Sequence, residues 1–323
     1  MQNLGTLDNR FTILTNFRND LDRKYYTAED NQNNINRIIV VKNNVNNNNN
    51  FPANEINVLN ILQNVNNPHV LHYIGNGNGQ LILNNQPPIN VNYLIFEHVY
   101  RIDLLSPILE REFTEIQAKL IFKKILNGIQ AIHNVNICHR NIAPDNFIFD
   151  ENFNIKIFGF ELCCLNANNL QEFVGNIPYV APEIFNRQPY DGIISDIFSL
   201  GKLLFCLVRG RMAFIAPNIN EQPYSFIRNY QYNDFWAFYP GLNLSDNFKN
   251  LFVRMIAYKP EERPTINAIL NDAWMQEINN LNADQIHNLE NQVIQELQIR
   301  EAEIRNLNMQ QQKIHMDDNI GER

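Results

Sequence analysis

The stretch that decides the fold is His139-Arg140-Asn141-Ile142-Ala143-Pro144-Asp145-Asn146, in a chain of 323 residues. Just before it, over residues 115–133, isoleucine and leucine recur every three or four positions, a spacing that predicts an amphipathic helix. The helix therefore leads directly into a loop rich in polar side chains. The loop is followed closely by Ile155-Lys156-Ile157-Phe158-Gly159-Phe160-Glu161-Leu162, and the two stretches are interpreted as one unit.

Together the two stretches resemble the catalytic loop and the metal-binding turn of eukaryotic protein kinases of the Ser/Thr type. The patterns of that family are His-Arg-Asp-x-x-x-x-Asn and Asp-Phe-Gly. Asn141 stands where the family has the aspartate that accepts the proton of the substrate hydroxyl, and Gly159 stands where it has the magnesium-binding aspartate. The resemblance therefore implies a degenerate kinase, of the kind called a pseudokinase.

Residues that brace the kinase fold are present. Ala181-Pro182-Glu183 resembles the motif that closes the activation segment, and the resemblance implies a buried ion pair between Glu183 and Arg263. Asp196 matches the aspartate that accepts hydrogen bonds from the catalytic-loop backbone, with His139 packed beneath that loop. Taken alone, each motif is commonplace and is better explained as a helix cap. Their order along the whole chain favours the kinase interpretation.

Arg140 matches the family arginine that holds a phosphorylated activation segment. Residues 159–175 contain no Ser, Thr or Tyr, so this part of the segment has no acceptor for a phosphate. Any switching of the segment is expected to use another route.

Nucleotide binding would depend on a few positions carried over from the family. Lys42 matches the lysine that holds the phosphates, and the resemblance implies that it pairs with Glu55. Glu97 and Val99 lie in the expected adenine-contacting hinge, and Asn146 is the remaining candidate ligand for magnesium. The competing interpretation of Lys42 and Glu55 is an exposed strand lysine and an ordinary acid at a helix start.

The glycine-rich lid over the phosphates is missing. No glycine occurs between Gly5 and Gly75, whereas a lid needs glycines to let the backbone approach the phosphates. Asp20 and Asp22 in the corresponding region would repel a polyphosphate, and Ala143 replaces a positively charged lysine. We therefore expect low or absent nucleotide affinity and no confident cofactor.

Three interpretations of function remain open. The first is a pseudokinase that acts as a scaffold or allosteric regulator of a protein partner, such as an active kinase. The second is an atypical Ser/Thr kinase that uses ATP and magnesium, with Asp145 or Glu161 as a substitute acid. We favour Glu161 as a solvated loop acid instead. The third is a structural coiled-coil component that carries a degenerate domain.

The pattern predicts an α+β, bilobal kinase-like fold, with a small antiparallel-sheet lobe at residues 1–98 and a larger helical lobe at 99–276. In the small lobe, strands are expected at 70–74, 80–83 and 93–97, and a helix at 55–62. Residues 277–323 predict a long C-terminal helix with a stuttered heptad pattern. Because Arg300 and Gln311 occupy seam positions, packing on its own lobe and self-association as a coiled coil are weighed equally.

Composition limits the partners. The net charge of -8 argues against nucleic acid and anionic membranes, and no apolar run is long enough to cross a bilayer. The four cysteines show neither a metal-binding spacing nor the dense pattern of a secreted disulfide scaffold. A reducing, cytoplasmic location is expected.

Overall fold

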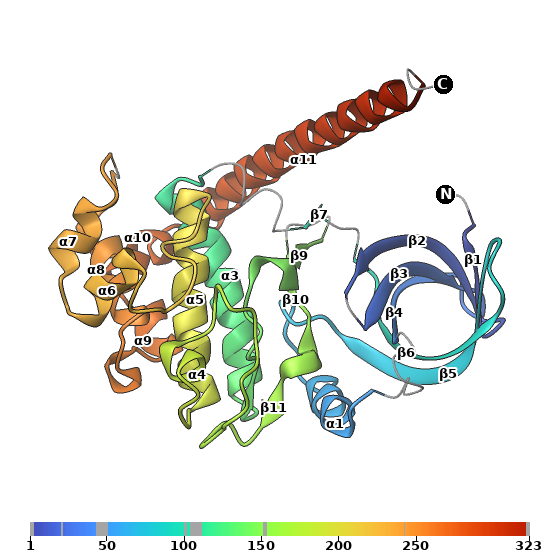
Figure 1. The fold of residues 1–323 in the computed structure, drawn as a ribbon, viewed down its shortest axis with the longest axis horizontal. Helices are drawn as coiled ribbons and strands as arrows, with labels where there is room; N and C mark the ends of the chain where they lie inside the picture. The colour runs from blue at the N-terminus through green and yellow to red at the C-terminus, as the bar shows by residue number, and fades with distance from the viewer. Residues whose placement is uncertain are drawn as a thin grey trace.

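The computed structural model describes residues 3–20, 22–42, 51–99, 102–103, 112–150, 154–241 and 243–320, without the side chains of 102–103, 301 and 304–320. Its chain forms a strand-rich lobe and a helix-rich lobe, and one long helix projects from the latter (Figure 1).

The small lobe is a closed antiparallel barrel with the strand order β1-β2-β3-β4-β6-β5. Its strands are β1 Gly5–Leu7, β2 Phe11–Asn19, β3 Arg23–Asp30, β4 Ile35–Lys42, β5 Tyr73–Leu83 and β6 Ile89–Glu97. β1 closes the barrel by pairing with both β2 and β5. Closure leaves no free sheet edge among these strands and buries apolar side chains on the inside of the barrel.

β4 shows why the barrel is buried on both faces. Ile39 and Val41 point into the barrel core, whereas Ile38 and Val40 belong to the core shared with the other lobe. Successive strand residues face opposite sides, so a continuous apolar run fits a strand covered on both.

One expectation for this lobe is wrong. The two strands expected at 70–74 and 80–83 are a single strand, β5, which runs through Gly75, Gly77 and Gly79. A Cβ atom at Gly77 would lie 2.5 Å from the Tyr93 ring on β6, so glycine permits this close approach. The three glycines therefore belong to one tightly packed strand.

The helix of the small lobe is α1, Ala53–Leu62, which begins directly after Pro52. Its Asn54 side chain donates to the Cys163 carbonyl at 2.9 Å, which ties the helix to the helical lobe. The lobes are also joined by backbone bonds from Leu71 to the Ile157 carbonyl and from Ile157 to the His69 carbonyl.

The large lobe is built around two long helices, α3 and α5. α3, Glu115–His133, starts with a capping box formed by Thr114 and Gln117. α5, Gly192–Arg209, is capped by Asp191 and ends at Gly210 with φ 60°. The other helices are α4 Pro182–Phe185, α6 Gln222–Arg228, α7 Tyr232–Ala237, α8 Asp246–Met255, α9 Ile266–Leu270 and α10 Gln276–Asn279.

Short strands and 3-10 turns carry the loops that face the small lobe. The strands are β7 Ile102–Asp103, β8 Ile137–Cys138, β9 Phe147–Phe149, β10 Ile155–Ile157 and β11 Cys164–Leu165. The turns are Pro144–Asn146, Phe160–Leu162, Pro260–Glu262 and Ala273–Met275. β9 pairs with β7 and β10, and β8 pairs with β11, so both quoted sequence stretches are anchored at each end.

The C-terminal helix α11 spans Ala283–Ile320 and leaves the lobe beside α3 (Figure 1). Leu289, Val293 and Leu297 are buried against the lobe. Arg300 is also buried, with its guanidinium over the Phe113 ring. The first half of the helix therefore packs on its own lobe, and the seam position Gln311 lies outside the described side chains.

Candidate nucleotide cleft

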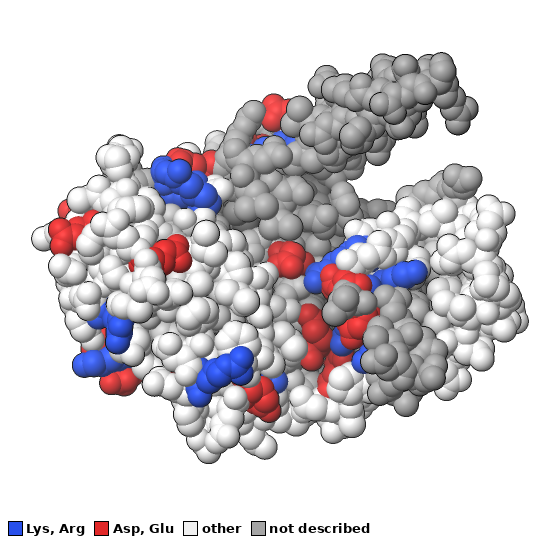
Figure 2. Space-filling view, in the orientation of Figure 1, with Lys and Arg blue, Asp and Glu red and all other residues white. Residues whose placement is uncertain are grey.

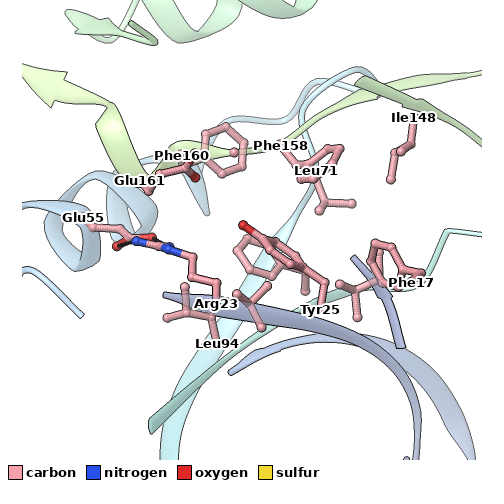
Figure 3. A pocket seen from close by; sticks show the side chains of 14 residues that line it. Phe17, Arg23, Tyr25, Glu55, Leu71, Leu94, Ile148, Phe158, Phe160 and Glu161 are labelled. Carbon is pink, nitrogen blue, oxygen red and sulfur yellow. Dashed lines mark hydrogen bonds and ion pairs between the residues drawn. The ribbon is translucent and has the colours of Figure 1, made fainter. Parts of the chain in front are cut away.

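The cleft between the two lobes is lined mainly by aromatic and aliphatic side chains (Figure 3). Tyr25 and Val40 come from the barrel, and Ile148 and Phe158 come from the helical lobe. The open volume in the cleft is about 20 Å³, enough for about one water molecule. Ligand pockets typically measure about 300–1,000 Å³. As it stands, the cleft is filled by its own side chains.

The central ion pair of the cleft differs from the expected one. Both Glu55 oxygens accept hydrogen bonds from Arg23, at 2.6 and 2.9 Å, and both side chains are buried. The expected pair of Glu55 with Lys42 is therefore wrong for this structure. Lys42 instead lies 3.7 Å from Asp22. Burial opposes the charge on Arg23, but its hydrogen bonds to Glu55 raise its pKa overall.

The strand register explains this exchange of partners. Arg23 is directly opposite Lys42 in the β3–β4 ladder, so both side chains lie on the same face of the barrel. A guanidinium fork can engage both oxygens of one carboxylate, which an ammonium group cannot. Arg23 therefore pairs with Glu55, the acid that the family pattern assigns to Lys42.

A second arginine reaches from the barrel to the catalytic loop. Arg18 on β2 donates one guanidinium nitrogen to the Asp145 carbonyl at 2.9 Å and to Asn146 Oδ1 at 3.1 Å. The same group lies over the rings of Tyr25 and Phe158, with distances of 4.9 and 5.3 Å to the ring centres. The Arg18 guanidinium thus donates a hydrogen bond to Asn146 Oδ1, the amide oxygen that was expected to bind magnesium.

Asn146 and Gly159 fit each other closely. The Asn146 amide donates to the Asn141 carbonyl at 2.7 Å. Gly159 has φ 78°, and a Cβ atom there would clash with Asn146 Oδ1. An aspartate at position 159 would therefore require the Asn146 side chain to move. The described residues also contain no group of three or more His, Cys, Asp or Glu side chains placed to hold a metal ion.

Asn141, at the position of the expected base, has a neutral side chain that already makes a hydrogen bond. Asn141 Nδ2 donates to Glu161 Oε1 at 2.7 Å. Glu161 is partly buried and lines the cleft, so the interpretation as a solvated loop acid is wrong. Among the described residues that hydrogen-bond to Asn141, which are His139, Glu161 and Asn146, Glu161 is the one acid.

Beneath the cleft, the catalytic loop is held from the α5 side. The backbone amides of His139 and Arg140 donate to the two Asp196 oxygens at 2.7 and 2.8 Å. His139 is fully buried, and its Nε2 lies 3.1 Å from the Phe158 carbonyl. Burial lowers the pKa of His139, so the ring stays neutral near pH 7.

The second brace is the ion pair between Glu183 and Arg263. Two Arg263 nitrogens donate to the two Glu183 oxygens at 2.6 and 2.7 Å. Arg263 also donates to the Ala257 carbonyl, and its guanidinium lies over the Phe198 ring. The pair was expected from the order of the motifs, and the structure forms it in a buried, bidentate geometry.

Arg140 is held without a phosphate. Its side chain donates to the Leu162 carbonyl at 2.6 Å and lies 3.2 Å from the Glu172 carboxylate. It also contacts the Tyr190 hydroxyl. Glu172 belongs to the part of the activation segment that lacks phosphate acceptors. An exposed acid of the segment thus supplies the negative partner of this arginine.

The hinge residues named from the sequence do not line the cleft. Glu97 accepts hydrogen bonds from the His72 amide and from Lys156 Nζ, at 2.9 and 2.8 Å. Val99 is buried in the shared core. Neither residue belongs to the lining of the described cleft, so the expected adenine contacts are not preformed.

Charge is sparse on the face shown in Figure 2, and acidic and basic side chains gather there where the two lobes meet. No helix in the described parts of the chain is long and apolar enough to cross a membrane.

Two lobes around a cleft, with a catalytic loop held by a buried aspartate, define a protein kinase domain. The protein kinase domain family matches residues 24–275, and the chain belongs to that family. The resemblance found in the sequence is thereby confirmed.

Two curated relatives illustrate the similarity. CBL-interacting protein kinase 15 of Oryza sativa subsp. japonica is 31% identical over 191 residues, which cover 57% of this chain and 42% of that protein. Sperm motility kinase Z of Mus musculus is 31% identical over 188 residues, covering 57% of this chain and 36% of that protein. The match thus spans less than half the length of these relatives.

Sequence reasoning missed three residues of the site: Arg18, Arg23 and Glu172. Arg23 had a usable signal, because a hairpin joining β3 to β4 sets it opposite Lys42. Arg18 and Glu172 gave none, since their partners lie 127 and 32 residues away in the sequence.

Proposed function

We propose that this chain is a pseudokinase, a kinase-shaped binding module that recruits or allosterically regulates a protein partner and does not transfer phosphate. The single observation that carries the proposal is the Arg18 guanidinium bonded to the Asp145 carbonyl and Asn146 Oδ1. A fixed cation at this place competes with a divalent metal for the same amide oxygen. Without the metal, the charge that develops during phosphoryl transfer is not offset.

Other features of the cleft support the same function. Asn141 cannot take a proton near neutral pH, and general-base help is typically worth about 10²–10⁴ in rate. The closed cleft has no preformed room for an adenine ring or for a polyphosphate. The braces that keep the loop in shape are retained, as a module that only binds partners requires.

A second candidate is an atypical ATP-dependent Ser/Thr kinase. The observation in its favour is the Glu161 carboxylate, which lies in the cleft 2.7 Å from Asn141 Nδ2. In this alternative Glu161 serves as the base, Lys42 holds the phosphates, and magnesium displaces Arg18 from Asn146. Asp145 is the other acid within the loop.

A thermal-shift experiment with ATP, with and without magnesium, separates the two candidates. A ligand at 100 times its dissociation constant stabilises a protein by about 2.7 kcal/mol. We expect no magnesium-dependent shift in the wild type and no phosphate incorporation into a general protein substrate. A shift that needs magnesium, together with incorporation lost in Lys42→Ala, would establish the kinase instead. Arg18→Ala is the matched variant, because it frees Asn146 while leaving Lys42 in place.

The partner, location and domain division follow from the same proposal. We propose a cytoplasmic protein, divided into lobes at 1–98 and 99–276 and a tail at 277–323, whose partner is a protein such as an active kinase. Its acidic net charge disfavours nucleic acid and membranes. Self-association through 277–323 would use the part of α11 beyond Arg300, since the earlier part packs on its own lobe. Sedimentation of the full chain and of a chain ending at Arg300, which keeps the packed part of the helix, tests this.

A further inference from the structure

Two cysteines face each other where the catalytic loop meets the activation segment. Cys138 lies on β8, directly before His139, and Cys164 lies on β11. They are opposite one another in the antiparallel β8–β11 ladder, and their sulfur atoms are 3.2 Å apart. Both cysteines are free thiols in this structure.

The backbone geometry suits a covalent bond between these sulfurs. Residues opposite each other in an antiparallel ladder have Cα atoms about 4.5–5.5 Å apart, which falls inside the range of about 4.4–6.8 Å that a disulfide requires. Bond formation therefore needs movement of the sulfur atoms and no shift of either strand. The second ladder pair, Leu165 opposite Ile137, keeps the strands in register.

The surroundings make the two sulfurs chemically unequal. The hydrogen bond with Cys138 and the nearby Arg140 guanidinium lower the pKa of Cys164. The same hydrogen bond and burial raise the pKa of Cys138. Cys164 is thus the sulfur of the pair that loses its proton more readily, which makes it the better nucleophile of the two.

The other two cysteines lack such a partner. Cys163 Sγ donates to the His139 carbonyl, and Cys206 Sγ lies 3.7 Å from the Tyr179 hydroxyl. Burial raises the pKa of both thiols, so neither is activated. They provide matched internal controls for any oxidation of the chain.

We propose that Cys138 and Cys164 are a redox pair that hydroperoxides convert to a disulfide. The Cys164 thiolate attacks hydrogen peroxide, forms a sulfenic acid and releases hydroxide. The Cys138 thiol, giving its proton to the departing oxygen, then forms the S–S bond and releases water. Two sulfurs are oxidised and one peroxide is reduced to hydroxide and water, so atoms and electrons balance.

The disulfide would close a loop that contains the whole degenerate site. Asn141, Asn146, Gly159 and Glu161 all lie between the two cysteines. A cross-link at the base of this loop limits the motion of the catalytic loop against the start of the activation segment. The oxidised form is therefore expected to exchange its amide hydrogens more slowly in this loop than the reduced form.

The test is peptide mapping by mass spectrometry of the full chain treated with hydrogen peroxide and then with a thiol-blocking reagent. We expect one cross-linked peptide that joins Cys138 to Cys164, reversed by dithiothreitol, and free thiols at Cys163 and Cys206. The cross-link should be absent in Cys138→Ser, in which Cys164 should accumulate as sulfenic or sulfinic acid, and unchanged in Cys206→Ser.

Several outcomes would overturn the proposal. They are a cross-link of Cys138 to Cys163, oxidation of Cys164 in the wild type without any cross-link, and no reaction of Cys164 at peroxide levels that oxidise free methionine added to the sample. The wild-type map decides the pairing by itself, so a serine variant that fails to fold does not affect the result.

Discussion

The catalytic loop has two sides, and they differ in chemistry. On the side of α5, Asp196 binds the loop backbone through charge-assisted hydrogen bonds, and the pair of Glu183 with Arg263 is buried nearby. On the side of the cleft, Asn141 and Gly159 are uncharged, and an arginine of the barrel contacts Asn146. The side that holds the loop in shape keeps its charges, whereas the side that would meet phosphate and metal lacks the two aspartates that the family has at positions 141 and 159.

This difference indicates which groups a fold needs and which only a reaction needs. A buried acid such as Asp196 stabilises the fold because its oxygens satisfy backbone amides that would otherwise be unpaired. An aspartate at position 159 would serve to hold a metal ion, and its Cβ atom would lie too close to Asn146 Oδ1 in this structure. A kinase fold can therefore lack the acids needed for phosphoryl transfer and still keep the acids that stabilise the fold.

The largest expected loss of stability comes from a substitution on the α5 side of the catalytic loop, which keeps its charged residues. Glu183→Ala leaves the Arg263 guanidinium buried without its carboxylate, which typically costs about 3–5 kcal/mol. The free energy of unfolding, measured by urea denaturation, should fall by that amount. The control is Glu262→Ala, which removes an exposed partner of Lys259 and should cost less than about 1 kcal/mol.

A double variant separates the stranded charge from the loss of the pair. In Glu183→Leu with Arg263→Met no charge is left unpaired, so the loss of stability should be smaller than in Glu183→Ala. If Glu183→Ala unfolds at the urea concentration of the wild type, the buried pair does not contribute to the fold, and the contrast between the two sides fails.

Next in size is an attempt to restore the metal ligand on the altered side. Gly159→Asp should destabilise the protein by about 1–3 kcal/mol, because φ 78° is unfavourable for a side chain and the new Cβ would meet Asn146 Oδ1. Combined with Asn141→Asp, it should still give no phosphate incorporation. Thermal denaturation and a radiolabel assay measure the two effects.

Gly241→Asp is the matched control for this experiment. Gly241 has φ 83°, and a Cβ atom there would have nothing within 4 Å, so the substitution carries the same backbone cost without the clash. The difference between the two variants isolates the contact with Asn146. Phosphate transfer by the double variant would mean that the altered side lacks only its acids and that Arg18 yields to magnesium.

What the sequence could predict follows the same division. The brace residues were predictable because Asp196, Glu183 and Arg263 lie in motifs whose residue types and order are specific. The partner of Glu55 was not, because Lys42 and Arg23 face the same way and the choice between them depends on side-chain shape. Motif position identifies a place in a strand, and it does not identify which neighbour reaches the acid.

Long-range closure was also beyond the sequence. β1 is three residues long, and the β5 residues that pair with it lie 74 to 78 positions later, so no local pattern predicts the barrel. The tail illustrates the intermediate case. Its apolar spacing predicted a long helix, but whether Leu289 and Val293 meet the lobe or another chain depends on the shape of the lobe surface.

A pH experiment tests whether the buried Lys202 on the α5 side of the molecule is charged in the folded protein. Lys202 on α5 is fully buried, and burial lowers its pKa from 10.5 to about 7. Between these values the unfolded chain keeps a proton that the folded protein releases, so stability rises with pH. Between pH 7 and about 8 this one group gives a slope that approaches about 1.4 kcal/mol per pH unit, to which the histidines and cysteines add contributions of their own.

Urea denaturation across this pH range measures the slope. Lys202→Met removes the group that titrates and should flatten the dependence, whereas Lys249→Met, which changes a lysine beside the exposed Asp246, should leave it unchanged. Equal slopes for the wild type and Lys202→Met would mean that the lysine keeps its proton in the folded protein and is not a buried neutral amine.

The smallest expected effect lies where the two sides meet, at Arg140. Its acidic partner Glu172 has a side chain that is 63% exposed, and Arg140 keeps its bond to the Leu162 carbonyl when that acid is removed. Glu172→Ala should therefore cost only about 0.2–1 kcal/mol, and less at high salt, where exposed charges are screened.

Hydrogen exchange of residues 170–175 at low and high salt is the sensitive measurement, because a global unfolding experiment barely resolves so small a change. Faster exchange in the variant at low salt, with the difference lost at high salt, would indicate that a carboxylate orders the segment where a phosphate cannot form. Identical exchange under both conditions would mean that Arg140 is positioned by the backbone and Tyr190 alone.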